Sequence, residues 1–164
     1  MTSLRPVYGL RPGTLICLSP AECMLAAVAG ANRRIESFDR ADSAGLESGD
    51  WTMDIEGAAG EMAVAKLLKR YWGGDVNTFH AGDVGRVQVR STELEDGCLI
   101  VRPADPVADT FVLVVGRAPR FRVVGYISGQ EARQERWWRA PNGRPGAWFV
   151  PQSELSAFTR RQGA

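Results

Sequence analysis

Four polar residues in the middle of the chain have types and spacing that suit phosphoester chemistry. Glu61 lies within a helical pattern, Asp83 precedes a short alternating run, and Gln88 and Arg90 stand two positions apart within that run. Residues two apart in a strand point to the same face, so Gln88 and Arg90 should project together. Two acids and a carbonyl-type oxygen suit Mg²⁺, and a basic side chain beside the ion can contact a phosphate. These four residues therefore form a candidate metal-dependent site.

Each of these residues also has a structural explanation. Glu61 falls beside Leu68 inside the apolar stripe of its helix, where a carboxylate needs a hydrogen bond, neutralisation or a cation unless it reaches water. Asp83 stands between glycines and fits a turn that leads into a strand. Gln88 and Arg90 fit the solvated face of a half-buried strand. The residues alone leave both explanations open.

Composition predicts one soluble domain over residues 1–164. Hydrophobic residues make up 45% and charged residues 24%, as in ordinary globular proteins, and no apolar run approaches the length of a membrane span. The first residues lack the pattern of a secretory signal, and Cys17, Cys23 and Cys98 include no CxxC pair, which indicates reduced thiols and a cytoplasmic location. His80 is the one histidine, which excludes histidine-based triads and multi-histidine zinc sites; it is either a proton shuttle beside Asp83 or a surface or packing residue. Motifs for nucleotide-dependent transfer and serine hydrolysis are absent.

The net charge of +1 argues against a protein that coats nucleic acid by bulk charge. Arginines nevertheless gather in the second half of the chain, which indicates either a local basic face or a general preference for Arg over Lys. Two loops, RAPR and WWRAPNGRPG, combine arginine with turns or aromatics that could contact phosphates and bases. A tryptophan pair that caps the core explains the second loop equally well. The candidate nucleic-acid contacts are Arg86, Arg117, Arg120, Arg139 and Arg144.

The periodicity predicts two helices followed by a sheet. Ser19 and Glu22 form a capping box at the start of a helix over 20–38, and a second helix is expected over 51–74, ended by Gly73 and Gly74. The segments VNTF, RVQVRS, CLIVR, FVLVVG and FRVVGYI read as strands, the last two as a hairpin. Short helical turns are expected after Ser128 and near the C-terminus. The expected fold class is α/β (α+β), with a mixed central sheet of about five strands flanked by helices.

The order GEMAVAKLL, GDVG, VQVRST resembles the core of the PD-(D/E)XK nuclease-like superfamily. Longer segments, HAGDVGRVQVRST and WRAPNGRPGAWFVPQSEL among them, resemble uncharacterised phage and prophage proteins over most of the chain. The resemblance implies a restriction-endonuclease-like fold and Mg²⁺-dependent hydrolysis of DNA in a bacterial or phage-infected cell. By this resemblance, Glu61 and Asp83 hold the ion, Gln88 and the Val89 carbonyl complete its ligands, and Arg90 stabilises the phosphate.

Two departures from the superfamily pattern weaken this expectation. Arg90 replaces the usual lysine and cannot lose its proton at neutral pH, and only four residues separate Asp83 from Gln88. Arg90 and the uncharged Gln88 favour a second hypothesis, a catalytically inactive relative that binds nucleic acid or a protein partner. A homo-oligomer is a further expectation, and the aromatic segment around Trp137, Trp138 and Trp148 is its candidate surface.

Overall fold

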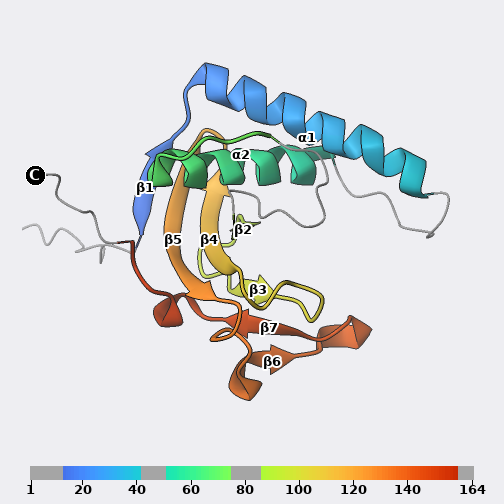
Figure 1. Cartoon of the computed structure of the whole chain (residues 1–164), viewed down its shortest axis with the longest axis vertical. Helices are drawn as coiled ribbons and strands as arrows, with labels where there is room; N and C mark the ends of the chain where they lie inside the picture. Colours follow the sequence, from blue (N-terminus) through green and yellow to red (C-terminus); the bar gives the residue numbers. More distant parts are fainter. Residues whose placement is uncertain (1–12, 42–50, 75–85, 159–164) are drawn as a thin grey trace, which may run out of the picture.

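The computed structural model describes residues 13–41, 51–74 and 86–158. Two helices, a four-stranded sheet and a three-stranded sheet make up this part of the chain, so the α+β class is confirmed (Figure 1). The elements are β1 (Thr14–Cys17), α1 (Pro20–Ala41), α2 (Trp51–Leu68), β2 (Val87–Thr92), β3 (Leu99–Val101), β4 (Thr110–Arg117), β5 (Arg120–Ser128), β6 (Trp138–Arg139) and β7 (Ala147–Val150). Three 3₁₀ turns lie at Glu135–Trp137, Pro141–Gly143 and Gln152–Glu154.

The larger sheet is mixed and has four strands. Its order is β1-β5-β4-β2, with β2 parallel to β4 and the other pairs antiparallel. The second sheet, β3-β7-β6, is antiparallel and lies at the opposite end of the molecule from the helices (Figure 1). The expected mixed sheet is confirmed, but it has four described strands where about five were expected, because β3 joins β7 instead of the larger sheet. The predicted strand VNTF lies outside the described residues.

Both helices stack on the same side of the larger sheet, which corrects the expectation of a sheet flanked by helices. α2 packs directly on the sheet and α1 packs on α2 (Figure 1). A Cβ on Gly30 of α1 would lie 2.5 Å from the Cα of Ile55, and one on Gly60 of α2 would lie 2.3 Å from the Ser91 hydroxyl. The two small residues therefore let α2 approach α1 on one side and β2 on the other.

The start of α1 follows the predicted capping box. The Glu22 N–H donates to the Ser19 hydroxyl (3.2 Å), and the Ser19 N–H donates to the Glu22 carboxylate (2.6 Å). These bonds satisfy backbone donors that the first turn leaves without helical partners. Lys66 of α2 donates to the same carboxylate (2.8 Å), so the cap also joins the two helices.

The end of α2 differs from the prediction. The helix stops at Leu68, and Lys69 takes a left-handed backbone conformation with φ of 53°. The Arg70 N–H then donates to the Ala65 carbonyl (2.9 Å), which is the bond of a Schellman cap. Glycine is the usual residue in this left-handed conformation, so the sequence predicted the end of the helix at Gly73 and Gly74. In the structure Lys69 takes this conformation and the helix ends earlier.

Two cores lie on the two faces of the larger sheet. α1 and α2 cover one face, where Val89, Val112 and Val114 are buried. The smaller sheet and the Trp137 turn cover the other face, where Phe111 and Leu113 are buried. The predicted hairpin of β4 and β5 is confirmed and supplies residues to both cores. Among the described residues, neither helix is long and apolar enough to cross a membrane.

Candidate functional site

Strand β2 divides the predicted site residues between two faces of the sheet. In the register with β4, Gln88 pairs with Phe111 and Arg90 with Leu113, while Val89 pairs with Val112. Phe111 and Leu113 belong to the core beneath the smaller sheet. Gln88 and Arg90 therefore share one face, as the alternation predicted. This face points away from α2, so the pair does not converge with Glu61 of α2 as expected.

Glu61 is buried and held by two residues that its pattern did not identify. The Arg33 guanidinium of α1 donates to both carboxylate oxygens at 2.5 Å, and the Trp72 indole N–H donates to one of them at 3.3 Å. Such bidentate, charge-assisted bonds are the strong class of hydrogen bond. Glu61 is therefore stabilised in its apolar surroundings by an ion pair and hydrogen bonds, one of the outcomes expected for a carboxylate in an apolar stripe.

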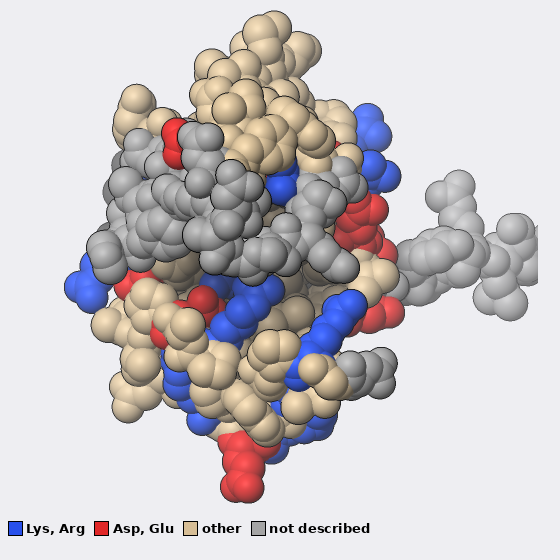
Figure 2. All heavy atoms as spheres, turned by 90° about the vertical axis from the view of Figure 1, so that its right-hand side faces the viewer, with Lys and Arg blue, Asp and Glu red and all other residues tan. Residues whose placement is uncertain are grey.

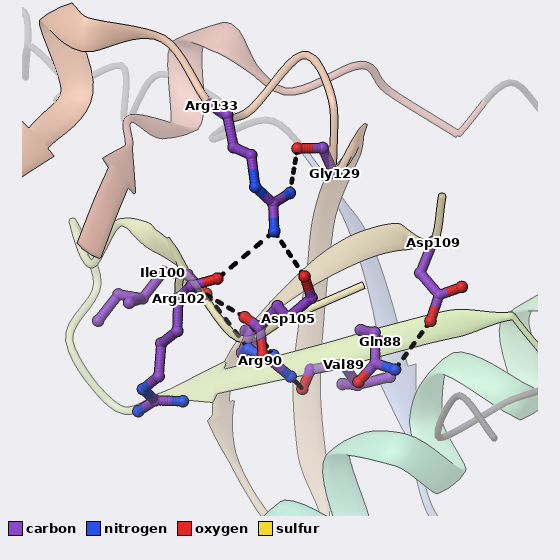
Figure 3. Close-up of polar contacts among 9 residues, drawn as sticks. All are labelled: Gln88, Val89, Arg90, Ile100, Arg102, Asp105, Asp109, Gly129 and Arg133. Atoms are coloured by element: carbon purple, nitrogen blue, oxygen red, sulfur yellow. Dashed lines mark hydrogen bonds and ion pairs between the residues drawn. The ribbon is translucent and has the colours of Figure 1, made fainter. Parts of the chain in front are cut away.

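Arg90 is also engaged by its surroundings (Figure 3). Its guanidinium forms an ion pair with Asp105 (2.9 Å) and donates to the carbonyls of Ile100 (3.2 Å) and Val89 (3.2 Å). The same group lies over the Phe111 ring, 5.2 Å from its centroid. Arg90 thus ties β2 to β3 and to the segment between β3 and β4.

Gln88 and a second arginine extend this polar network. The Gln88 amide donates to Asp109 (3.0 Å), a buried carboxylate immediately before β4. Arg133 donates to the carbonyls of Gly129 (2.5 Å) and Asp105 (2.6 Å) from the far side of the same segment (Figure 3). Segment 102–109 is therefore clamped from two sides. Asp105, Asp109 and Arg133 were not predicted, because the contacts that join them to β2 and to segment 102–109 link residues far apart in sequence.

A cavity of about 360 Å³ opens between α2 and β2 on the helix side of the sheet. The residues that line it include three acidic residues, Glu56, Glu61 and Glu93, together with Ser91. Glu56 accepts a hydrogen bond from the Ala118 N–H (2.8 Å), and Glu93 forms an ion pair with Arg117 (3.3 Å). Each of the three carboxylates thus already accepts from a partner within the fold.

The predicted magnesium ligands that the structure describes do not form a donor set for this ion. Both Glu61 oxygens accept from Arg33, the Val89 carbonyl accepts from Arg90, and Gln88 projects from the other face of the sheet. No cluster of three or more His, Cys, Asp or Glu side chains suited to a metal occurs among the described residues. Asp83 and His80 lie outside these residues, so the complete four-residue site stays a prediction.

The candidate nucleic-acid contacts are spread over the molecule. Arg117 and Arg120 flank the turn between β4 and β5, near α2, whereas Arg86 precedes β2 at the opposite end of the β4 strand. Arg139 and Arg144 lie beside the Pro141–Gly143 turn of the smaller sheet. Figure 2 shows basic side chains across the lower part of one face with acidic side chains beside them. The described arginines thus do not form one uniform basic surface.

The aromatic segment predicted to support oligomerisation is partly used within the fold. Trp137 is buried in the core under the smaller sheet. Trp138 and Trp148 contact each other edge to face, with ring centroids 4.8 Å apart. The Arg133 guanidinium lies over the Trp148 ring. Capping of the core, the alternative explanation, accounts for much of this segment.

The outer face of α1 is a candidate site that the sequence analysis did not identify. Large apolar side chains on it are 52–68% exposed: Met24, Leu25, Val28, Ile35 and Phe38. Trp51 of α2 extends this apolar surface and contacts Phe38, with ring centroids 6.0 Å apart. Contiguous apolar surface of this kind is typical of protein contact sites. The signal was present as a spacing of three and four residues, but that spacing alone does not say whether a helix face is buried.

No family model, no curated protein and no solved structure matches this chain.

Proposed function

We propose that this chain is a non-catalytic interaction domain that binds a protein partner through the outer face of α1. The observation that carries the proposal is the row of half-exposed apolar side chains on that face, from Met24 to Phe38. Covering apolar surface stabilises a complex by roughly 25 cal/mol of free energy for each Å² removed from water. A partner that covers the row recovers this free energy.

The engagement of the predicted catalytic residues supports the same proposal. Glu61 has its two oxygens on Arg33, and Arg90 has its guanidinium on Asp105 and two carbonyls. A metal at Glu61 would have to replace a bidentate ion pair, and a phosphate at Arg90 would have to replace Asp105. Both residues instead stabilise the packing of elements that are distant in sequence.

The competing hypothesis is the restriction-endonuclease-like domain with Mg²⁺-dependent cleavage of DNA in the cytoplasm. It requires Asp83 together with Glu61 and Gln88 around one ion. A cleavage assay on plasmid and oligonucleotide DNA with Mg²⁺ or Mn²⁺ distinguishes the interaction domain from the nuclease. It compares the wild-type chain with Asp83→Ala and Glu61→Gln. We expect all three proteins to show the same background level of cleavage. Cleavage by the wild type that both substitutions abolish would overturn the proposal.

A second measurement tests the surface itself. An environment-sensitive apolar dye should bind the folded chain at concentrations where it is monomeric, and the double variant Val28→Glu, Ile35→Glu should bind it several-fold less. The matched control is Leu94→Glu, which places the same charge at an exposed leucine in the turn after β2. Equal dye binding by all three chains would contradict the assignment of this face.

DNA binding is measured separately by fluorescence anisotropy at low salt. We expect no binding that depends on Arg86 or Arg120. Salt-dependent binding that is lost in the double variant Arg86→Ala, Arg120→Ala would support a nucleic-acid partner and overturn the proposed protein partner.

A further inference from the structure

We infer that the occupant of the outer face of α1 is α1 of a second copy of this chain, packed antiparallel about a two-fold axis. The inference rests on the proposed function, because it names the partner for the same surface. Four properties of the face support it: the spacing of its residues, their order of size along the helix, the near absence of charge, and the exposed apolar area.

The spacing indicates that the occupant is itself a helix. Apolar residues along the outer side recur at alternating steps of three and four, all exposed except the partly buried Ala31: Ala21, Met24, Val28, Ala31, Ile35 and Phe38. A repeat of this kind places apolar side chains along one seam, where knobs from a facing helix fit into holes between them. The helix has 22 residues and is about 33 Å long, so the row covers most of its length.

The order of sizes makes the row complementary to itself when one copy is reversed. In an antiparallel pair of such seams, positions whose numbers sum to 59 lie opposite each other. Phe38 then lies opposite Ala21 of the second copy, and Val28 lies opposite Ala31. Met24 lies opposite Ile35. Large residues thus meet small or flexible ones, and the same patch serves both copies, as a two-fold contact requires.

The row brings no formal charges together. Among the exposed residues of α1 between Ala21 and Phe38, Asn32 is the one polar uncharged residue, and Glu36 is the one charged residue, at the edge of the row. Arg33 and Arg34, which carry the positive charges of this stretch, face α2 and form ion pairs with Glu61 and Asp54. Two copies can therefore approach without placing like charges opposite each other.

The exposed apolar area supports a dimer. A specific interface buries roughly 800 Å² on each partner, with about 500 Å² as a lower bound. Five large apolar residues on α1 together with Trp51 are 46–68% exposed, and full burial of an aromatic side chain such as Phe38 or Trp51 removes roughly 150–250 Å² from water. These six residues supply a large share of the area that a dimer requires.

The experiment measures the mass of the full chain by sedimentation equilibrium over a wide range of concentration. We expect reversible dimerisation of the wild type, and a monomer for Met24→Glu and for Ile35→Glu at concentrations where the wild type is a dimer. Leu94→Glu should dimerise as the wild type does. Far-ultraviolet circular dichroism and thermal unfolding show that each variant is folded.

A charge-pair variant tests the antiparallel arrangement. In Met24→Glu, Ile35→Lys, each new glutamate faces a new lysine of the other copy, so dimerisation should be recovered at least in part. In a parallel pair, each new charge would face its own kind, and the variant would stay monomeric. The matched control Met24→Glu, Ile35→Glu should remain a monomer in either arrangement.

Three results would overturn the inference. A wild-type monomer at every concentration, or a dimer that Met24→Glu and Ile35→Glu leave intact, would exclude this face as the contact between copies. A charge-pair variant that is folded and monomeric would exclude the antiparallel pairing. A monomer whose dye binding is still lost in Val28→Glu, Ile35→Glu would reject the second copy yet leave the proposed function in place.

Discussion

The two faces of α1 differ in the size of the apolar residues they carry. The inner face packs small residues such as Ala26, Ala29 and Gly30 on α2, beside the ion-paired Arg33 and Arg34. The outer face presents large apolar residues such as Met24 and Ile35 to solvent. A surface helix typically buries its large apolar residues and exposes its charges. In this chain small apolar residues, ion pairs and close backbone approach hold the helix in place, so its large apolar residues remain available. Burial and side-chain size are thus uncoupled on this helix, and this locates the proposed contact surface.

The largest loss of folding stability is expected from breaking the Arg33–Glu61 ion pair on the inner face of α1. Glu61→Ala removes the carboxylate that Arg33 and Trp72 contact, and unfolding in urea should show a loss of about 3 kcal/mol, as for one partner of a buried pair. The double variant Arg33→Met, Glu61→Leu should be clearly more stable than Glu61→Ala, because no buried charge is left behind. A single variant as stable as the wild type would show that the pair does not hold α1 in place.

A somewhat smaller loss is expected where the helix backbones approach. A methyl group on Gly30 would overlap the backbone of Ile55, so Gly30→Ala should cost roughly 2 kcal/mol despite its better helix propensity. The control is Gly57→Ala in α2, where a Cβ would have no atom within 4 Å. That variant should gain up to about 1 kcal/mol in thermal unfolding. Equal effects at the two glycines would contradict the close approach of the helices.

Glu22, at the start of α1, is expected to contribute to folding stability in a pH-dependent way. Hydrogen bonds from Lys66 and then from Ser19 lower the pKa of Glu22 below its ordinary value of about 4.5. Its contribution to stability is therefore fully present above that value and is lost as the pH falls through the lowered pKa. Because the group is near solvent, the effect should be a few tenths of a kcal/mol.

Chemical unfolding between neutral and acidic pH checks this contribution. Glu22→Gln should remove part of the acid destabilisation that the wild type shows. An identical pH profile for the two chains would show that Glu22 does not couple the helix start to Lys66.

The smallest effect is expected on the outer face. Leu25→Ser and Ile35→Ser change side chains with few neighbours, so the unfolding free energy of the monomer should change by less than about 0.5 kcal/mol. The wild type should instead show a melting temperature that rises with protein concentration, and both variants should lose this dependence. A large loss of monomer stability in either variant would mean that the face packs within its own chain.

Local features of the fold followed from the sequence. The capping box of α1 depends on Ser19 and Glu22, three residues apart, and the β4–β5 hairpin depends on two apolar runs around a short turn. Contacts between residues close in sequence leave a local pattern, so they could be predicted. β1 was missed because its four residues carry little pattern, and α2 was extended too far because Lys69 takes a conformation usual for glycine.

The surroundings of the candidate site could not be predicted in the same way. The strand alternation correctly placed Gln88 and Arg90 on one face. It did not show that this face lies away from Glu61, because that depends on which side of the sheet α2 covers. It also could not identify Asp105 as the partner of Arg90, or Arg33 as the partner of Glu61. These ion pairs join elements far apart in sequence, which no local pattern links.

The sequence by itself determined the two helices, the main hairpin and the need of Glu61 for a partner, because propensity, capping and the cost of burying a charge act locally or on single residues. The tertiary structure alone decided that β2 runs parallel to β4, that Arg33 is the partner of Glu61, and that the apolar row of α1 faces outward. Long-range packing decides these features. Ion pairs, glycine contacts and small buried residues such as Ala26 fix α1 on α2, and the side of α1 left over carries its large apolar residues.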